Sequence, residues 1–268
     1  NDIDGGCSYG RVSAVLGAVA AFGRRVMPAY QGGKSRLAKH LVDAIALEVG
    51  SVECWVEPFV GGGSVAAAAA GRFGCDLVLS DIDPHAAVLW DRATGFEWPD
   101  DAVFSEDDWH RLREADEVDK MTALAAFGAS FGGKKWAGFA RPDLRWSPDL
   151  QCEFGRSFRS WRRKFDAMSV AGLVSSECLP YWRVVPPEGS VVYCDPPYAG
   201  TRGYSSGKFD HDRFYAWCEA QTVPVFVSEF TAPPHWRVVF EKEQTRSIRS
   251  NDGSKMPEKL FRVCNVRA

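Results

Sequence analysis

The chain has 268 residues and a formal net charge of −3, and 46% of its residues are hydrophobic while 25% are charged. These proportions exclude an intrinsically disordered chain, and the net charge by itself does not indicate a nucleic-acid partner. A chain of this length buries a large core, so it needs neither disulfides nor a metal ion to fold.

The residues before position 27 predict no part of a folded domain. Residues 12–22 are apolar and small, as in a signal peptide, but this run is too short to span a bilayer. We interpret residues 1–26 as an extension of unknown role, either a peripheral helix or a leader. Export is the less favoured alternative, and we expect no membrane association.

From about residue 30, helix-like and strand-like segments alternate, which is typical of an α/β fold with a mostly parallel sheet. Apolar residues at helical spacing predict helices, and short apolar runs predict strands. The helices are expected at residues 35–49, 65–70 and 84–93, and the strands at residues 52–56, 76–81, 190–195 and 224–229.

The middle of the chain changes in character. Residues 97–119 hold ten Asp or Glu against two Arg, whereas residues 132–165 are basic and rich in aromatic side chains. Cations attract phosphates and aromatic rings stack on bases, so this stretch indicates contact with nucleic acid. The alternative is a helical subdomain whose aromatic side chains form its own core. The candidate contact residues are Lys134, Lys135, Trp136, Arg141 and Arg145.

The sequence Asp195, Pro196, Pro197 and Tyr198 follows an apolar strand, at the sheet edge where α/β proteins bind ligands. The two prolines stiffen the loop and remove two N–H donors. An amino group on an aromatic ring becomes nucleophilic when a carboxylate and a carbonyl both accept its hydrogens. Asp195 and the Pro196 carbonyl have these acceptors, and Tyr198 offers a flat face for a base. The alternative is a simple proline turn.

A glycine-rich loop, residues 57–63, lies between a predicted strand and a helix. Its glycines let a ligand approach the backbone at a helix N-terminus, although they do not have the G-x-G-x-x-G spacing of dinucleotide sites. Asp81 ends the next strand, where an acid can bind two ribose hydroxyls. The alternative for Asp81 is a turn residue.

Residues 30–35, with Gly32, Gly33 and Lys34, form a second turn before a helix. These residues do not have the G-x-x-x-x-G-K-[ST] spacing of a nucleotide phosphate loop. Such a turn could instead hold the carboxylate of an amino-acid-like cofactor, and a plain helix-capping turn is the alternative.

In this order, the three motifs resemble those of the D12 class of N6-adenine DNA methyltransferases, the Dam-like family of bacteria and phages. The resemblance covers roughly residues 27–266. It implies a Rossmann-like methyltransferase sheet, formed by residues 27–95 and 171–268, with a helical target-recognition insertion at residues 96–170.

The resemblance also implies an adenine-specific DNA methyltransferase that takes its methyl group from S-adenosylmethionine and acts on a flipped base of double-stranded DNA. A role in restriction-modification or phage biology would follow. Residues 195–198 would hold the adenine. Cofactor contacts would come from Tyr30, Gly33, Lys34, Glu57, Pro58, Phe59, Gly61, Gly63, Asp81 and Asp195.

The cysteines complete the expectations. Eight are scattered along the chain without a C-x-x-C pair, which argues against a zinc site and fits reduced thiols, so we expect a cytoplasmic, metal-free protein. None has the setting of an activated nucleophile, which disfavours cytosine C5 methylation. We further expect a monomer or a weak dimer.

Some alternatives stay open. Residues 127–136 lack the arginine-tyrosine-asparagine signature of GATC-specific enzymes, so the target sequence is not given. The nearer alternative function is an amino-methyltransferase acting on RNA, on cytosine N4 or on a protein glutamine. The more distant one is a non-catalytic nucleic-acid-binding protein with the same fold.

Overall fold

The computed structural model describes residues 30, 32–93, 96, 104–141, 153–198, 209–242 and 257–264. In chain order the α-helices are α1 (Ala38–Val49), α2 (Ser64–Phe73), α3 (Pro84–Val88), α4 (Glu106–Ala115), α5 (Lys120–Gly128), α6 (Glu153–Met168) and α7 (His211–Glu219). The strands are β1 (Cys54–Glu57), β2 (Asp76–Asp81), β3 (Val174–Cys178), β4 (Ser190–Cys194), β5 (Val225–Glu229), β6 (Arg237–Lys242) and β7 (Glu258–Arg262). Two single 3₁₀ turns are η1 (Phe131–Gly133) and η2 (Tyr181–Arg183).

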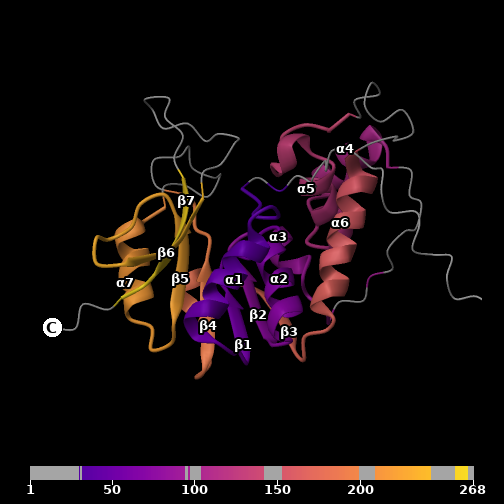
Figure 1. The fold of residues 1–268 in the computed structure, drawn as a ribbon. Helices are drawn as coiled ribbons and strands as arrows, with labels where there is room; N and C mark the ends of the chain where they lie inside the picture. Colours follow the sequence, from indigo (N-terminus) through magenta and orange to yellow (C-terminus); the bar gives the residue numbers. More distant parts are fainter. Residues whose placement is uncertain are drawn as a thin grey trace, which may run out of the picture.

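The seven strands form one sheet in the order β3-β2-β1-β4-β5-β7-β6 (Figure 1). The five strands from β3 to β5 run parallel, whereas β7 is antiparallel to both of its neighbours. The expected Rossmann-like α/β fold is confirmed, with an antiparallel strand that the sequence analysis did not predict.

Both faces of the central strands are buried. Successive residues of a strand point to opposite faces, and Trp55 and Val56 of β1 are both fully buried. Trp55 lies in the core shared with α1 and α2, and Val56 lies in the core shared with α7. Parallel strands of this kind read as continuous apolar runs, which is why β1 and β4 could be predicted.

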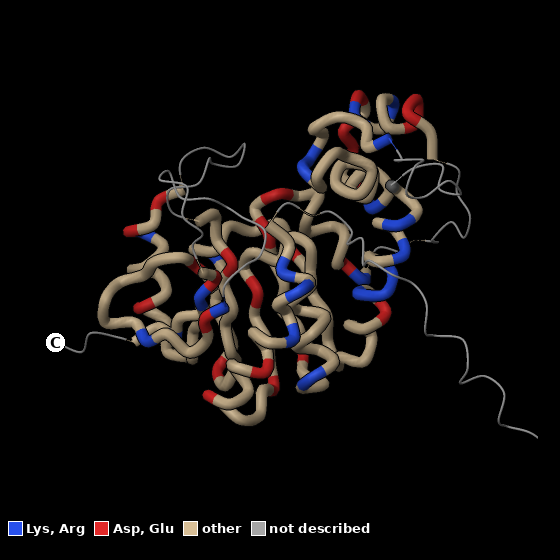
Figure 2. The backbone as a smooth tube through the Cα atoms, turned by 45° about the horizontal axis from the view of Figure 1, so that its top comes forward, with Lys and Arg blue, Asp and Glu red and all other residues tan. Residues whose placement is uncertain are grey.

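Helices α4, α5 and α6 lie between β2 and β3 in the chain and pack beside the sheet (Figure 1). Helix α6 packs against both α2 and α5. Its Phe154, Phe158 and Trp161 recur at helical spacing and are buried, so they belong to the core. Of the two interpretations of these aromatic residues, the structure favours the core. Basic residues recur along the exposed side of α6 (blue in Figure 2).

Two acidic residues in the described part of the acidic stretch, Asp108 and Asp119, take part in helix caps. Ser105 and Asp108 form a reciprocal capping box at the start of α4, and Asp119 accepts the Thr122 N–H at the start of α5. Acidic side chains stabilise helix N-termini in this way. These carboxylates therefore have a local structural role.

The helix expected over residues 84–93 is wrong beyond Val88. Asp83 caps the helix and Pro84 starts it, but α3 ends after five residues. The chain then turns so that the indole of Trp90 packs against the glycine loop, with its Nε1 donating to the Gly61 carbonyl at 3.0 Å. Tertiary packing overrides the helical pattern here.

Candidate active site

Three acidic side chains mark the carboxyl ends of neighbouring strands. Glu57 is the last residue of β1, Asp81 is the last residue of β2, and Asp195 follows β4 directly. Because these strands are adjacent and parallel, their ends lie at one edge of the sheet. The motifs that contain them therefore meet at this edge.

Lys34, just before α1, places its ammonium group between two carboxylates. Its Nζ lies 2.9 Å from Asp195 Oδ1 and 3.5 Å from Glu258 Oε1. The same Nζ lies 4.6 Å from the centre of the Tyr198 ring, and the Tyr198 hydroxyl donates to Glu258 Oε1. We call these four residues the Lys34 cluster.

The Lys34 cluster is largely shielded from water. Lys34 is 9% exposed and Glu258 only 2%, whereas Asp195 is 19% exposed and is the most accessible of the three charged groups. Burial, followed by repulsion from Asp195, raises the pKa of Glu258, although Lys34 opposes the shift. Burial also raises the pKa of Tyr198 well above its usual value, so its hydroxyl stays a hydrogen-bond donor.

The loop that carries Asp195 is held from β5 and α7. His211 Nε2 donates to the Pro197 carbonyl at 3.0 Å, and the Tyr198 ring packs edge-on against Phe230 with ring centres 4.6 Å apart. Phe230 in turn donates its backbone N–H to Glu229 Oε1 at 2.7 Å. The loop thus has a fixed position relative to the end of β5.

The glycine loop is closed onto the end of β2. Gly61 donates its N–H to Asp81 Oδ2 at 2.9 Å, and Asp83 donates to Asp81 Oδ1 at 3.0 Å. Burial raises the pKa of Asp81 to about 6. Gly63 is the N-cap of α2 and has φ +60°, and a Cβ there would lie 2.3 Å from the Trp90 ring. The glycine at position 63 is therefore required by the packing of Trp90.

Tyr30 covers the same loop from the other side. A Cβ on Gly61 would lie 2.7 Å from its ring, and the ring also packs against Phe127 of α5. Gly33 donates to the Tyr30 carbonyl at 2.8 Å, which closes the turn before Lys34. The turn at residues 30–35 and the glycine loop at residues 57–63 are thus in direct contact.

Glu57 and Lys164 lie behind the glycine loop. Glu57 is 2% exposed, accepts a hydrogen bond from Trp55 Nε1 at 3.1 Å, and has a pKa raised well above its usual value by burial. Lys164 of α6 donates to the Gly62 carbonyl at 2.6 Å, and burial lowers its pKa to about 8. A cation of the basic stretch therefore contacts the glycine loop.

Two predicted cofactor residues lie on the inner side of this edge. Pro58 is buried. The Phe59 ring stacks on the Tyr181 ring, with ring centres 5.5 Å apart, and packs edge-on against Phe214 of α7. Both side chains belong to the packing beneath the loop.

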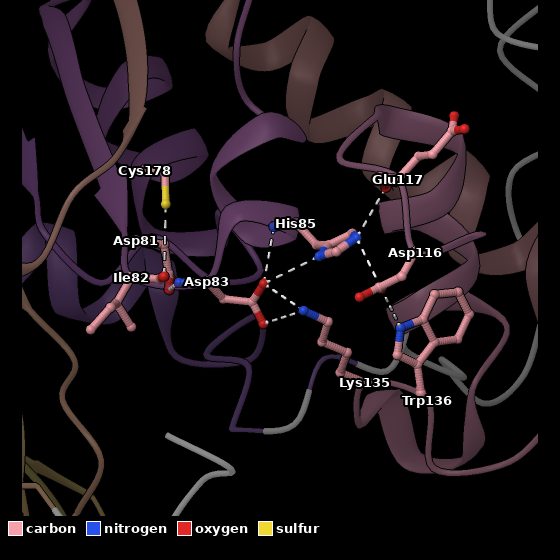
Figure 3. Close-up of polar contacts among 9 residues, drawn as sticks. All are labelled: Asp81, Ile82, Asp83, His85, Asp116, Glu117, Lys135, Trp136 and Cys178. Carbon is pink, nitrogen blue, oxygen red and sulfur yellow. Dashed lines mark hydrogen bonds and ion pairs between the residues drawn. The ribbon is translucent and has the colours of Figure 1, made fainter. Parts of the chain in front are cut away.

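The candidate nucleic-acid residues differ in their contacts, and Figure 3 shows those of Lys135 and Trp136. Lys135 pairs with both carboxylate oxygens of Asp83, at 2.9 and 3.1 Å. Trp136 donates to Asp116 at 3.3 Å and packs edge-on against Trp109. Lys134 and Arg141 are exposed, and Arg141 pairs with Glu106. Arg145 lies outside the described residues.

Glu258, Trp90 and Lys164 were missed as members of the site. Each reaches it from a distant part of the chain, and no local motif surrounds it. A buried acid at the start of a charged segment (EKLFR) gives no signal that it will face Lys34.

Within the described ranges, no group of three or more His, Cys, Asp or Glu is arranged to hold a metal ion. The helices of that part of the chain are also too short or too polar to cross a membrane.

Comparison with known proteins gives one family. Residues 30–117 match the model of the D12 class N6 adenine-specific DNA methyltransferases. Among solved structures, the chain is similar to the rRNA methyltransferase aviRa from Streptomyces viridochromogenes (11% identity, 88% of this chain and 87% of that chain, TM-score 0.43). It is also similar to the putative methyltransferase yhhF from Escherichia coli (13% identity, 88% of each chain, TM-score 0.38).

No curated protein gives a significant match. The match over residues 30–117 confirms the family resemblance for the turn at residues 30–35, the glycine loop at residues 57–63 and Asp81. The chain is therefore a methyltransferase, and its residues 30–117 match the D12 class of N6 adenine-specific DNA methyltransferases.

Proposed function

We propose that the protein transfers a methyl group from S-adenosylmethionine to the N6 amino group of adenine in double-stranded DNA. The observation that carries the proposal is the Asp195 carboxylate. It lies beside the Lys34 ammonium, on a proline-stiffened loop at the same sheet edge as the glycine loop.

The residues of this edge fit the cofactor. Asp81 keeps acceptor capacity beyond its two backbone hydrogen bonds, which suits the hydroxyls of a ribose. Lys34 supplies a cation for the amino-acid carboxylate, and Tyr30 and the backbone at Gly61 and Gly63 border the adjoining space. When bound, S-adenosylmethionine supplies an electrophilic methyl group on a positively charged sulfur.

The reaction then depends on how this chain holds the acceptor amine. The base must leave the duplex stack to reach the sheet edge. Asp195 and the Pro196 carbonyl accept the two N6 hydrogens, which directs the nitrogen lone pair toward the methyl group, and Tyr198 contacts the base. After transfer the nitrogen carries one surplus proton, which the Asp195 carboxylate can take. Placing both reactants in attack geometry supplies much of the acceleration.

DNA contact is proposed for the insertion at residues 96–170, with residues 27–95 and 171–268 forming the catalytic domain. Helix α6 carries five cations against two acids, and Arg159, Arg162 and Arg163 are exposed. Lys134 and Arg141 would add to this surface, and Arg145, outside the described residues, is proposed as a further DNA contact. A methyl mark of this kind suits a restriction-modification or phage-encoded system.

Nucleoside analysis tests the proposal. Unmethylated plasmid DNA, total RNA and protein extract are each incubated with the purified protein and S-adenosylmethionine, then digested and analysed by mass spectrometry. We expect N6-methyldeoxyadenosine from the DNA, and far less of it over the same incubation with the Asp195→Ala variant. Appearance of N4-methylcytosine, methylated RNA or methylglutamine instead would overturn the assignment to adenine in DNA.

A further inference from the structure

Glu258 is a buried acid that no step above uses. It begins β7, is 2% exposed, and lies in the most deeply shielded part of the Lys34 cluster. Burying an ionisable group without partners is unfavourable, and among the described residues Glu258 contacts the Lys34 ammonium at 3.5 Å and the Tyr198 hydroxyl. Both partners are residues proposed to serve the reaction.

Within the described residues, the Lys34 ammonium lies beside two carboxylates, Asp195 and Glu258, in addition to the cofactor carboxylate proposed above. A cation bound wholly to Asp195 would draw electron density from the oxygens that must accept the N6 hydrogens. A cation shared with a second carboxylate neutralises Asp195 less, so Asp195 remains a stronger hydrogen-bond acceptor. Lys34 Nζ contacts Asp195 at 2.9 Å and also lies within ion-pair distance of Glu258 at 3.5 Å, so its charge acts on both carboxylates.

We propose that Glu258 is a positioning residue for methyl transfer: it draws the Lys34 ammonium partly away from Asp195 and holds the Tyr198 ring by its hydroxyl. This inference rests on the proposed function. It assigns to β7 a role in setting the acceptor strength of Asp195 and the orientation of the base-contacting tyrosine.

The raised pKa of Glu258 adds a pH dependence of known sign. The groups that face Glu258 or pair with its strand position are Lys34, Asp195, Tyr198, Tyr193 and, across β6, Lys242. As the pH falls through the raised pKa, Glu258 becomes neutral and releases Lys34 to Asp195. Turnover by the wild-type protein should therefore fall on the acid side at a higher pH than an ordinary glutamate would give.

The first test is kinetic and uses Glu258→Gln, which keeps the size and a carbonyl acceptor for Tyr198 but removes the charge. We expect kcat on DNA to fall about tenfold or more, with KM for DNA within about threefold, and the acid limb of the pH profile to flatten. Glu241→Gln is the matched control, since Glu241 lies on the neighbouring strand, is exposed, and pairs with Lys259 at 3.9 Å. It should leave kcat and the melting temperature unchanged.

Two results would overturn the proposal: a kcat for Glu258→Gln within twofold of wild type, or a loss of kcat that only follows a lowered melting temperature. A Glu258→Gln/Tyr198→Phe double variant separates the two contacts. Because Gln still accepts from the Tyr198 hydroxyl, Glu258→Gln tests the Lys34 contact and Tyr198→Phe tests the hydroxyl contact. If the two contacts act separately, as proposed, the losses add in the double variant.

The second test needs no substrate. In protein labelled with ¹³C at the glutamate carboxyls, we expect Glu57 and Glu258 to titrate above the ordinary glutamate range, and the informative resonance is that of Glu258. This resonance should vanish in Glu258→Gln and titrate still higher in Lys34→Met, because Lys34 lowers the pKa of Glu258. If Glu258→Gln removes no high-titrating resonance, or Lys34→Met leaves the titration of Glu258 unmoved, the contact itself is overturned. This arm stands even if the wild-type protein methylates a substrate other than adenine in DNA.

Discussion

Asp195 carries a carboxylate, pairs with Lys34 and is partly accessible from outside the sheet edge. At 19% exposure it is reachable, and the Lys34 ammonium lies 2.9 Å from its Oδ1. Asp195→Ala removes the charged acceptor for the N6 hydrogens, so we expect methyl transfer to fall by about 10²–10³-fold, the scale for losing one preorganised electrostatic partner. Single-turnover rates measure this, and melting temperature checks the fold. A folded variant with near-normal turnover would contradict the role, and Asp195→Asn should be milder because it keeps an acceptor.

Asp81 is held by two backbone N–H groups, which leaves its remaining lone pairs for a ligand. Loss of a charge-assisted hydrogen bond is worth roughly 1.5–3 kcal/mol, so Asp81→Ala should raise the dissociation constant for S-adenosylmethionine about tenfold or more. Calorimetry measures this directly. An unchanged affinity would assign Asp81 to the turn between β2 and α3, where it already accepts from Gly61 and Asp83.

The same carboxyl predicts a pH dependence of cofactor binding. Burial raises the pKa of Asp81 to about 6, so the group is ionised above that pH and gains a proton below it. A protonated carboxyl is a weaker acceptor, and cofactor affinity should therefore decrease as the pH falls from 7.5 to 5. Asp81→Asn should bind weakly across this range with a flatter profile. Equal pH profiles for the wild-type protein and this variant would place the titrating group elsewhere.

The start of helix α2 is constrained by the packing of Trp90 against Gly63. Substitutions at Gly63 and at Gly71 of the same helix can measure this constraint. At Gly63 the backbone is left-handed and a Cβ would meet Trp90 at 2.3 Å, whereas Gly71 of the same helix has nothing within 4 Å. Gly63→Ala should destabilise the fold by about 2–4 kcal/mol, from backbone strain and overpacking. Gly71→Ala should stabilise it by about 0.5–1 kcal/mol. Thermal unfolding compares the two, and similar shifts would mean that Trp90 yields to the added methyl group.

Strands with apolar runs were predictable, and strands without them were not. The strand expected at residues 76–81 matches β2, and those at 52–56, 190–195 and 224–229 overlap β1, β4 and β5 within two residues at either end. Strands β3 (VSSEC) and β6 (RVVFEK) lie at the two edges of the sheet and are partly exposed. Strand β3 has no apolar run, and β6 has only three consecutive apolar residues between charged ones. Strand β7 is buried but begins with charged residues, because Glu258 reaches the Lys34 cluster.

The candidate site was predictable as far as one rule extends: carboxyl ends of parallel strands share an edge. That rule brings Glu57, Asp81 and Asp195 together from their positions after apolar strands. It says nothing of which distant side chains complete the site. Glu258 is more than 60 residues from Asp195 and more than 200 from Lys34, so its contacts depend on the order of strands in the finished sheet.

The distribution of charge over the whole molecule, at a net charge of only −3, bears on DNA binding. Lys135 is a poor choice for testing it, since it pairs with Asp83, which caps α3. Lys134 and Arg163 are exposed and lie in the proposed insertion. If both bind phosphates, Lys134→Gln/Arg163→Gln should flatten the slope of log affinity against log salt by about 0.9 for each phosphate that is no longer neutralised.

Affinity for S-adenosylmethionine and the melting temperature should stay near the wild-type values in this double variant, because neither side chain belongs to the Lys34 cluster or the glycine loop. Lys39→Gln removes one exposed charge from α1, outside the insertion, and should change neither DNA affinity nor its slope. Binding isotherms at several salt concentrations compare the three proteins. If the double variant keeps the wild-type slope, Lys134 and Arg163 do not bind phosphates. If Lys39→Gln lowers the slope as well, the attraction comes from overall charge and is not localised in the insertion.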